Sequence, residues 1–363
     1  MSTSPCTHAL PLSTLFFVLI AVILISRSQA RTLRPFNNSI SAVFIFGDST
    51  VDPGNNNYIG TPFKSNFPPY GRDFVNHTPT GRFCNGRLVT DFIASYVGVK
   101  DYVPPYLDPT LSIEELMTGV SFASAGSGFD PLTPMIGGVI PMSEQLEYFR
   151  EYKSKLELAI GKRGTKNLIN KAGFIVSAGT NDFVVNYFGT PIRRQSYTVS
   201  GYQQFLMQHV QQFIQGLLNE GAKKIGIVGL PPMGCLPGVI TLYSNTFHQR
   251  ECVETLSSIA RDYNQMLQKE LKALQNGLTQ IFYVDIDQPL RDMIQRHTSF
   301  GFEEVSTGCC GSGLFETSFT CNLESNVCED ASKYVFWDSI HPTEAAYYII
   351  FEAIRPTIDI AIK

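Results

Sequence analysis

The chain has 363 residues, of which 44% are hydrophobic and 17% are charged, so it can bury a sizeable core and disorder is not expected. Lys and Arg number 28 against 32 Asp and Glu, which gives a formal net charge of −4. This mild acidity, together with the lack of any basic run, argues against nucleic acid as a partner.

An apolar leader opens the chain. Residues 10–25 read LPLSTLFFVLIAVILI, and the small residues Ser28 and Ala30 that follow resemble a signal-peptidase site. A membrane anchor usually needs about 18 or more uninterrupted apolar residues, which is more than this run provides. We expect residues 1–30 to be a secretory signal peptide cleaved near Ala30, leaving a secreted chain without a stable membrane span. An uncleaved anchor is the alternative.

The rest of the chain alternates apolar runs with helical patterns. The apolar runs are continuous, which is typical of parallel strands covered on both faces. Four runs are clear and a fifth is weaker: 42–46, 173–178, 224–230 and 281–286, and then 119–123. Helical periodicity is found in 202–218, 251–274 and 343–354. This order predicts a mostly parallel sheet between helices, and we expect residues 31–363 to form one domain because no repeat or linker divides them.

The first strand runs directly into Gly47-Asp48-Ser49. The carboxyl ends of parallel strands border the crevice in which open α/β sheets bind ligands, so the Ser49 hydroxyl is placed where a nucleophile would stand. The alternative is an ordinary turn, because Gly, Asp and Ser are common turn residues. Serine also needs a neighbouring base to accept its proton, so Ser49 alone does not predict catalysis.

Residues 52–110 fit no regular pattern and are rich in Gly, Pro, Asn and aromatic residues. Long irregular segments of compact domains are often functional. We expect this one to lie near the strand ends and to contribute an apolar site for an acyl or aryl group. It also carries a glycosylation sequon at Asn76, and a second sequon at Asn37 precedes it; both are candidate sites in a secreted chain.

Two further turns are candidates to supply hydrogen-bond donors for a developing oxyanion. Gly126 lies in SFASAGSGF, where the lack of a Cβ leaves its backbone N–H open to close approach. Asn181 lies in GTND, shortly after the predicted strand 173–178, and has a side-chain amide to offer. Each residue also has a plain interpretation as part of a turn.

Among the six histidines, His341 is the candidate for a general base. It occurs in WDSIHPTEAA, with Asp338 three residues earlier and Pro342 directly after it. The proline disfavours a helical conformation at His341 and suits the first turn of a helix, which predicts a loop-to-helix junction. Asp338 on the same loop can accept a hydrogen bond from Nδ1 and orient the ring. The alternative is a helix-capping Asp beside a solvated His.

Seven cysteines follow the leader: Cys84, Cys235, Cys252, Cys309, Cys310, Cys321 and Cys328. Four of them fall within residues 308–328, which suits disulfides formed in an oxidising compartment. A zinc cluster is the alternative, although two adjacent cysteines and the lack of a nearby His fit zinc spacing poorly. Because seven is an odd number, at least one thiol stays unpaired within a monomer, and Cys84 is the candidate because it stands alone.

In combination these motifs resemble a known family. FGDSTVDPGNNN, GVSFASAGSG, SAGTNDF and VFWDSIHPTE occur in this order, accompanied by PPYGRDF, GLPPMGC and the GCCG segment. The chain strongly resembles the plant GDSL esterase/lipases of the SGNH-hydrolase superfamily over essentially its whole mature length. AGSGFDPLTP looks most like the extracellular-lipase subgroup. Cys84 and Ser121 stand where the family commonly has Ser and Asn, and neither is a candidate catalytic residue.

The resemblance implies a flavodoxin-like three-layer α/β/α sandwich with a mostly parallel five-stranded sheet. It implies Ser49 as the nucleophile, His341 as the general base and Asp338 as its partner. It also implies an oxyanion hole made by the Ser49 N–H, the Gly126 N–H and the Asn181 amide, with no metal and no organic cofactor. The expected function is hydrolysis of small-molecule or lipid esters through an acyl-enzyme.

Two other functions are compatible with the same motifs. One is an acyltransferase that passes the acyl group to a hydroxyl other than water, and the other is a non-catalytic extracellular protein that binds lipid or cell wall. An α/β-hydrolase is disfavoured because no G-x-S-x-G occurs, and nucleotide binding is disfavoured because neither glycine-rich phosphate motif is present. The sequence leaves the natural ester and the oligomeric state open.

Overall fold

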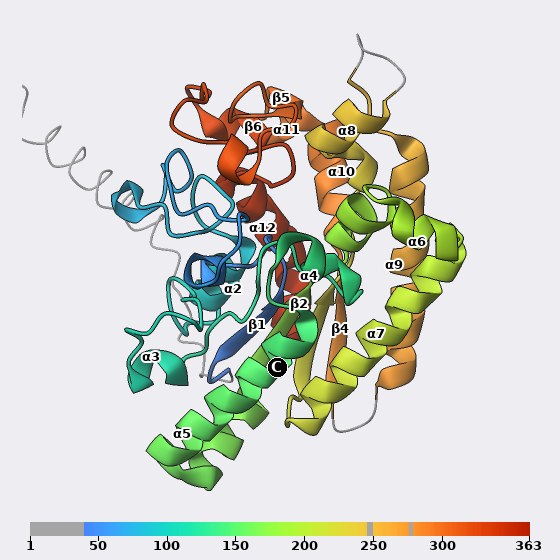
Figure 1. Cartoon of the computed structure of the whole chain (residues 1–363). Coiled ribbons are helices and arrows are strands. Elements are labelled where there is room, and N and C mark those ends of the chain that lie inside the picture. Colours follow the sequence, from blue (N-terminus) through green and yellow to red (C-terminus); the bar gives the residue numbers. More distant parts are fainter. Residues whose placement is uncertain (1–39, 245–249, 276–278) are drawn as a thin grey trace, which may run out of the picture. The chain divides into compact units, whose positions relative to one another are not determined.

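The computed structural model describes residues 40–244, 250–275 and 279–363. Within these residues four parallel strands form the main sheet in the order β1-β2-β3-β4, as the sequence predicts (Figure 1). The strands are β1 Val43–Gly47, β2 Gly173–Ser177, β3 Lys224–Val228 and β4 Gln280–Val284. The register pairs Gly47 with Ser177, so β1 and β2 end side by side at the carboxyl edge of the sheet.

The weaker fifth run lies beside β1 as an extended segment. The amide of Ile45 donates to the Val120 carbonyl over 3.2 Å, and the amide of Phe122 donates to the Ile45 carbonyl over 2.7 Å. Gly119 approaches β1 so closely that a Cβ would lie 2.1 Å from the Val43 carbonyl oxygen, which only glycine avoids. The edge position of the expected five-stranded sheet is therefore held by an irregular segment.

Helices cover both faces of the sheet and confirm the three-layer α/β/α sandwich (Figure 1). The larger hydrophobic core lies between the sheet and the first layer: α5 Met142–Lys171, α7 Val199–Asn219 and α9 Glu254–Leu274. Smaller cores lie under the second layer: α2 Val89–Tyr96, α10 Asp287–Gln295 and α12 Glu344–Ala361. Side chains of β1 are buried on both faces, and those of β2 and β3 alternate between buried and half-buried. Both faces are thus covered by helices, which explains the continuous apolar runs of the sequence.

Several helices differ from the sequence prediction. Helix α2 lies within the segment 52–110, for which the sequence showed no regular pattern, and helix α10 was not predicted either. Helix α5 was not predicted, because its solvent-facing side is so polar that the apolar stripe is hard to see, and because Gly161 (φ 74°) interrupts its helical backbone. Helix α12 continues past the expected end at Ile354 and through Pro356. Elsewhere the predicted helical ranges and the observed helices agree to within a few residues.

Shorter elements connect these layers. The short helices are α3 Ile113–Met117, α4 Leu132–Gly137, α6 Pro191–Ser196, α8 Pro237–Tyr243 and α11 His297–Phe300. A π-helix, η3, spans Asp182–Tyr187, and 3₁₀ turns are η1 Asn55–Tyr58, η2 Val75–His77, η4 Met233–Cys235, η5 Ser318–Thr320 and η6 Ala331–Lys333. A second, two-stranded sheet pairs β5 Glu304–Gly308 with β6 Tyr334–Phe336.

The asparagine run of the irregular segment 52–110 has a structural role. The Asn55 side-chain amide donates to the Ser121 and Ala123 carbonyls, each over 2.8 Å, and the Asn56 amide donates to the Ala125 carbonyl over 3.0 Å. These bonds help to satisfy backbone carbonyls of the edge segment. The irregular segment is thereby held against the carboxyl edge of the sheet, where the sequence analysis placed it.

Three disulfides are present among the described residues: Cys235–Cys252, Cys309–Cys328 and Cys310–Cys321. This confirms the expectation of disulfides and removes the zinc alternative, because all four cysteines of the clustered segment are paired. Cys84 is buried and carries a free thiol.

Among the described residues no helix is both long enough and apolar enough to cross a membrane. The predicted signal peptide 1–30, its cleavage near Ala30 and the sequon at Asn37 lie outside the residues that the structure describes. The sequon at Asn76 lies on an exposed turn, η2, where it is open to solvent.

Candidate active site

Ser49 follows β1 through a turn that only glycine can make. Gly47 has φ 139°, and a Cβ there would lie 1.9 Å from the Ser177 carbonyl oxygen of β2. The side chain of Gln145 on α5 fixes the same glycine from both sides, accepting from its N–H over 2.8 Å and donating to its carbonyl over 2.9 Å. The backbone therefore leaves the sheet in a fixed direction, and Ser49 stands at the carboxyl edge.

The structure brings Ser49 and His341 together although 292 residues separate them in the chain. The His341 Nε2 lies 2.7 Å from the Ser49 Oγ, and both residues are buried. A neutral imidazole can accept at Nε2 while it donates at Nδ1, which is the arrangement that removes a proton from a hydroxyl. The ring also packs against Phe83, with a distance of 5.0 Å between ring centroids.

Asp338 holds the other nitrogen of the ring. The His341 Nδ1 donates to Asp338, at 2.8 Å from Oδ2 and 2.9 Å from Oδ1. The carboxylate also accepts from the backbone amides of Ile340 (2.9 Å) and His341 (2.7 Å), which closes a tight turn. Burial alone would raise the pKa of Asp338, but the charge of His341 and these hydrogen bonds outweigh it and hold the pKa below its ordinary value. The carboxylate is thus ionised and can fix the tautomer of the ring.

The loop that carries these residues ends at α12, as the sequence analysis expected, with one difference. Thr343 is the N-cap, its hydroxyl accepting from the Ala346 amide over 3.2 Å, and the helix begins at Glu344. Pro342 therefore precedes the helix instead of occupying its first turn. It still disfavours a helical conformation at His341, so the ring is presented from the loop.

The two candidate oxyanion donors line the same cavity as Ser49 and His341. This cavity has a volume of about 100 Å³, and Gly126 and Asn181 form part of its wall. Gly126 has φ 87°, a conformation that favours glycine. The Asn181 amide nitrogen donates one hydrogen bond, to the Ser127 carbonyl over 2.9 Å. Because that nitrogen carries two hydrogens, one remains for a ligand.

Asp182 connects the segment that carries Asn181 to the loop that carries Gly126, a role that the sequence analysis missed. Its carboxyl group accepts from the amides of Phe129 (2.8 Å) and Asp130 (3.1 Å) and from the Thr133 hydroxyl (2.5 Å). It therefore joins the π-helix after Asn181 to the loop after Gly126. The available signal was its place directly after Asn181 in GTND. Burial raises the pKa of Asp182 to about 7.

This raised pKa predicts a pH-dependent contribution to stability. The ordinary value is 3.8, so between roughly pH 4 and pH 7 the folded chain binds this proton more tightly than the unfolded chain does. Stability from this group is therefore lost as the pH rises through that window. We expect the melting temperature to fall from pH 5 to pH 8, and the fall to be smaller in Asp182→Asn, which has no titratable group at this position. The exposed Asp262→Asn is the control and should keep the wild-type slope; equal slopes for all three proteins would contradict the prediction.

The other histidines that the structure describes lie apart from this cavity. His209 packs against the ring of Phe205 on α7, with 4.6 Å between centroids, and His297 Nδ1 lies 3.1 Å from the Phe302 carbonyl oxygen. His77 is exposed on η2. The structure therefore brings together the Ser, His, Asp, Gly and Asn that the sequence analysis selected, and no other described histidine lines the cavity.

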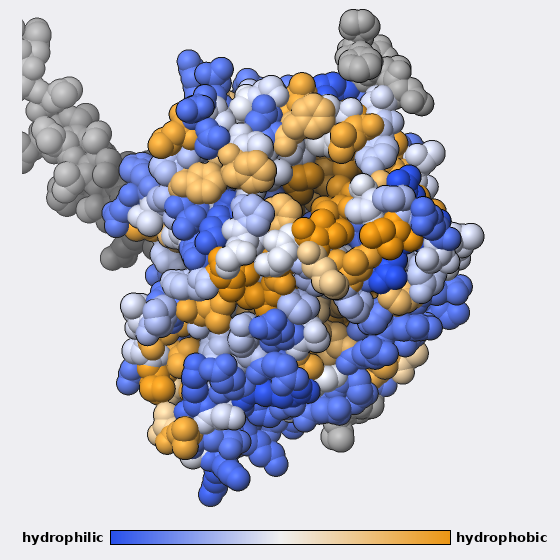
Figure 2. Space-filling model, in the orientation of Figure 1, coloured by the Kyte–Doolittle hydropathy of each residue, from blue (hydrophilic) through white to orange (hydrophobic). Residues whose placement is uncertain are grey.

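Exposed hydrophobic side chains lie on elements that border the cavity of Ser49 and His341. Figure 2 shows hydrophobic surface gathered around a hollow near α8 and the loops beside β5 and β6. The exposed hydrophobic residues on α4, on α8 and between β5 and β6 are Met135, Ile136, Leu242, Phe315, Phe319 and Leu323. Helix α4 also lines the cavity through Thr133, and the β5–β6 connection lines it through Thr317 and Ser318. The surroundings suit a ligand with apolar parts.

Comparison with known proteins agrees with this geometry. A family model described as GDSL-like lipase/acylhydrolase matches residues 43–354. The chain is 60% identical to the GDSL esterase/lipase At5g45960 of Arabidopsis thaliana over 327 residues, which is 89% of this chain and 87% of the relative. It is 44% identical to the GDSL esterase/lipase APG of the same plant over 323 residues, which is 88% of this chain and 91% of the relative.

Proposed function

The chain belongs to the GDSL-like lipase/acylhydrolase family and is a carboxylic ester hydrolase, and on that premise we propose that it is a secreted esterase or lipase acting through Ser49, His341 and Asp338. The observation that carries the proposal is the 2.7 Å contact between the Ser49 Oγ and the His341 Nε2. The bonds from Nδ1 to Asp338 support it further, because they leave Nε2 free to accept a proton.

The first half of the reaction forms an acyl-enzyme. The Ser49 Oγ attacks the carbonyl carbon of the ester while His341 Nε2 takes the hydroxyl proton. The resulting tetrahedral oxyanion is bound by the amides of Ser49 and Gly126 and by the side-chain amide of Asn181. The bond to the alcohol oxygen then breaks, and His341 gives its proton to the leaving alkoxide. Asp338 stays ionised and stabilises the imidazolium that forms in between.

The second half releases the acid. A water molecule attacks the acyl carbon while His341 takes its proton, and the same three donors bind the second oxyanion. The bond to Ser49 Oγ breaks, and the proton returns from His341 to Ser49. No step needs a metal or an organic cofactor, because the nucleophile, the base and the donors are all side chains or amides of this chain.

The substrate class follows from the lining of the cavity. Alongside the catalytic groups the cavity is lined by Phe63, Phe83, Val184, Val185 and Ile340. These side chains favour the acyl or aryl portion of an ester over a charged group, because burying a charge without a partner is costly. We therefore propose small-molecule or lipid esters with an apolar acyl part as substrates.

The test of this function is an assay of the purified mature protein on p-nitrophenyl esters of increasing acyl length. Products should be the free acid and p-nitrophenol, and both should depend on Ser49. Acyl transfer to an added hydroxylated lipid in place of water would instead identify an acyltransferase. A wild-type hydrolysis rate equal to that of the Ser49→Ala variant would instead indicate a non-catalytic binding protein.

The donor role of Asn181 has its own test. Removing one oxyanion donor typically lowers kcat by about 10²–10³, because the transition state loses a hydrogen bond that water cannot replace in a closed site. We expect this loss in Asn181→Ala, with KM changed much less. The melting temperature should be close to that of wild type, since the Asn181 side chain makes a single hydrogen bond within the described residues, to the Ser127 carbonyl. Near-normal kcat in a folded Asn181→Ala protein would remove Asn181 from the site.

Secretion and glycosylation are part of the same proposal. We propose that residues 1–30 are removed and that residues 31–363 fold as one domain carrying glycans at Asn37 and Asn76. The exposed position of Asn76 on η2 supports its use as an acceptor. N-terminal sequencing of the protein recovered from plant culture medium should begin near Arg31. Enzymatic deglycosylation should then lower its mass, and a protein retained in cells with Met1 intact would contradict secretion.

A further inference from the structure

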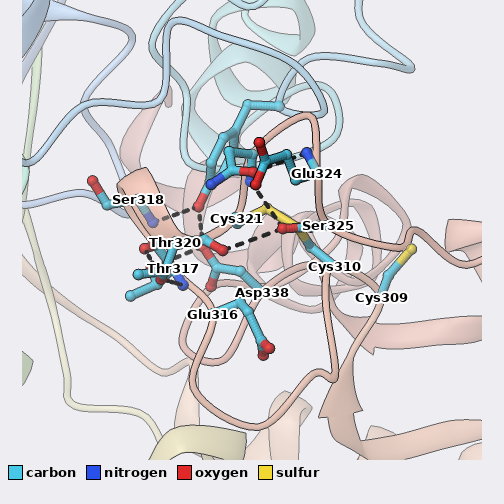
Figure 3. Close-up of a disulfide and its surroundings, with 12 residues drawn as sticks. Cys309, Cys310, Glu316, Thr317, Ser318, Thr320, Cys321, Glu324, Ser325 and Asp338 are labelled. Atoms are coloured by element: carbon cyan, nitrogen blue, oxygen red, sulfur yellow. Dashed lines mark hydrogen bonds between the residues drawn. A yellow bond between two sulfur atoms is a disulfide. The ribbon is translucent and has the colours of Figure 1, made fainter.

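The clustered cysteines form a loop over the active site. The Cys310–Cys321 disulfide closes a loop whose far side carries Thr317 and Ser318, as the close-up in Figure 3 shows. Both of these residues line the cavity that contains Ser49 and His341. Figure 3 also shows Asp338 beside Thr317, at the side of the loop opposite Cys309. The cysteine segment therefore reaches the acid of the Ser–His–Asp constellation.

Two hydroxyl groups hold the Oδ2 atom of Asp338. The Thr317 Oγ1 donates to it over 3.0 Å, and the Tyr70 hydroxyl donates to it over 2.8 Å. The direction of the second bond follows from its neighbour: the Ser318 amide donates to the same tyrosine oxygen over 2.7 Å, so the single hydroxyl proton of Tyr70 is directed to Asp338. Tyr70 is 1% exposed and Asp338 is fully buried, so this bond is made away from bulk solvent.

The carboxylate needs these two donors to keep its orientation. Its Oδ1 is held by the amides of Ile340 and His341, whereas its Oδ2 receives only the shared His341 Nδ1 and the two hydroxyls. Without the hydroxyls, Oδ2 would be held only by the shared bond from His341 Nδ1. The carboxylate could then rotate about the side at which the two amides hold Oδ1. The Nδ1 bond would then vary in length and angle, which weakens the control of the ring.

The loop itself is held in an unusual conformation. Ser318 has φ 50°, in the left-handed region that few non-glycine residues adopt. Its hydroxyl donates to the Lys64 carbonyl over 2.9 Å and accepts from the Lys64 amide over 3.1 Å, and the Cys321 amide donates to the Ser318 carbonyl over 3.0 Å. Backbone strain of this kind persists only where the surroundings enforce it, and it concentrates at functional sites. The disulfide and the Lys64 contacts are the enforcing surroundings here.

We propose that the Cys310–Cys321 loop is a positioning device of the active site, in which Thr317 and Tyr70 fix the Asp338 carboxylate against His341. The inference rests on the proposed function, because it assigns the loop a role in that same reaction. Thr317 and Tyr70 are positioning residues: they act on the base through Asp338. The disulfide holds Thr317 at its place, and the Tyr70 hydroxyl ties the loop and the carboxylate together through one oxygen.

The first test distinguishes the effect of the Thr317 hydroxyl as a donor from the effect of the side-chain volume. Thr317→Val keeps the volume and removes the donor, and Thr317→Ser keeps the donor. A hydrogen bond to a charged group contributes enough that we expect kcat to fall on the order of tenfold in the valine variant. The serine variant should recover most of the activity. Tyr70→Phe removes the second donor, and it also removes the acceptor of the Ser318 amide. It should lower kcat at least to a similar extent.

A pH profile separates positioning from loss of structure. Removing a donor leaves more negative charge on the carboxylate that faces the ring, which favours the protonated, inactive base. The acidic limb of kcat/KM should therefore move to higher pH in Thr317→Val and Tyr70→Phe, by about half a unit or more. The other ionisable groups around this pair, Asp48, Cys84 and Tyr347, are the same in all variants and do not confound the comparison.

The second test removes the disulfide. The double variant Cys310→Ser with Cys321→Ser should lose activity at least as much as Thr317→Val and show the same displaced acidic limb. The matched control is Cys235→Ser with Cys252→Ser, which removes the disulfide beside α9, outside the cavity. Its folded fraction should keep the wild-type profile. If the first double variant does not fold, the kcat values and pH profiles of Thr317→Val and Tyr70→Phe still test the positioning role.

The outcomes separate this inference from the proposed function. A wild-type protein without Ser49-dependent activity would end the proposed function. An active wild type whose folded Thr317→Val and Tyr70→Phe variants match it in kcat and in pH profile would overturn the positioning role alone. Equal losses in Thr317→Ser and Thr317→Val would likewise overturn it, because the hydroxyl would then not be the cause.

Discussion

Replacing Ser49 with alanine should lower kcat on p-nitrophenyl esters by about 10⁴–10⁶. The alanine removes the only atom that can form the acyl-enzyme, while the donors around the cavity remain and account for the residual rate. The Ser49 Oγ lies 2.7 Å from the His341 Nε2, and Ser49 is otherwise a small side chain at the end of a turn. Its removal should therefore leave the melting temperature within a few degrees of wild type.

The matched control for this variant is Ser257→Ala. Ser257 is also a buried serine, but it lies on α9 away from the cavity. Its hydroxyl takes no part in the proposed reaction, so kcat should stay within about twofold of wild type. A reactive fluorophosphonate gives a second measurement, since it should label wild type and Ser257→Ala stoichiometrically and Ser49→Ala not at all. Labelling or turnover that survives in Ser49→Ala would require another nucleophile.

Replacing Asp338 with asparagine should lower kcat on the order of 10³–10⁴. The carboxylate accepts hydrogen bonds at both oxygens, from two backbone amides, the His341 Nδ1 and the hydroxyls of Thr317 and Tyr70. In either orientation, an asparagine would turn its NH₂ group toward some of these donors. The ring of His341 would then lose its acceptor or take the tautomer in which Nε2 carries the proton, and that nitrogen could no longer accept from Ser49.

The control for the asparagine variant is Asp330→Asn. Asp330 caps the short turn η6 in the same region of the chain, but its carboxylate is exposed and accepts hydrogen bonds from Ser332, away from the cavity. This variant should keep wild-type kcat. Circular dichroism and a melting curve show whether Asp338→Asn is folded. A folded Asp338→Asn protein with kcat within tenfold of wild type would contradict the role of Asp338.

The sheet and the order of the site motifs were open to prediction because their signals are local. Each strand is a continuous apolar run of about five residues, and such runs arise when a parallel strand is covered on both faces. His341 stood out among the histidines because Pro342 excludes a helical conformation there and Asp338 lies on the same loop. Helix α5 was missed because its burial stripe is diluted by a highly polar outer face and broken at Gly161.

The partners of Asp338 could not be predicted in the same way. Tyr70 reaches it across 268 residues, and Thr317 reaches it from a loop whose shape depends on which cysteines pair. The sequence analysis counted the cysteines correctly but left their connectivity open, because several pairings are compatible with the same spacing. A hydroxyl on a tyrosine or threonine has no sequence pattern that shows which acceptor it will meet.

The sequence by itself was enough to predict the layered α/β architecture, the carboxyl-edge location of Ser49 and a pairing of Asp338 with His341 on one loop, since each depends on hydrophobic periodicity or on neighbours a few residues apart. Only the tertiary structure decided that the Ser49 hydroxyl and the His341 ring meet. The same holds for the bonds of Asp182 to the loop after Gly126 and for the contact of the Cys310–Cys321 loop with the Asp338 carboxylate. The physical reason is that hydrogen bonds act over about 3 Å, and atoms from distant parts of the chain reach that distance only after the core has packed.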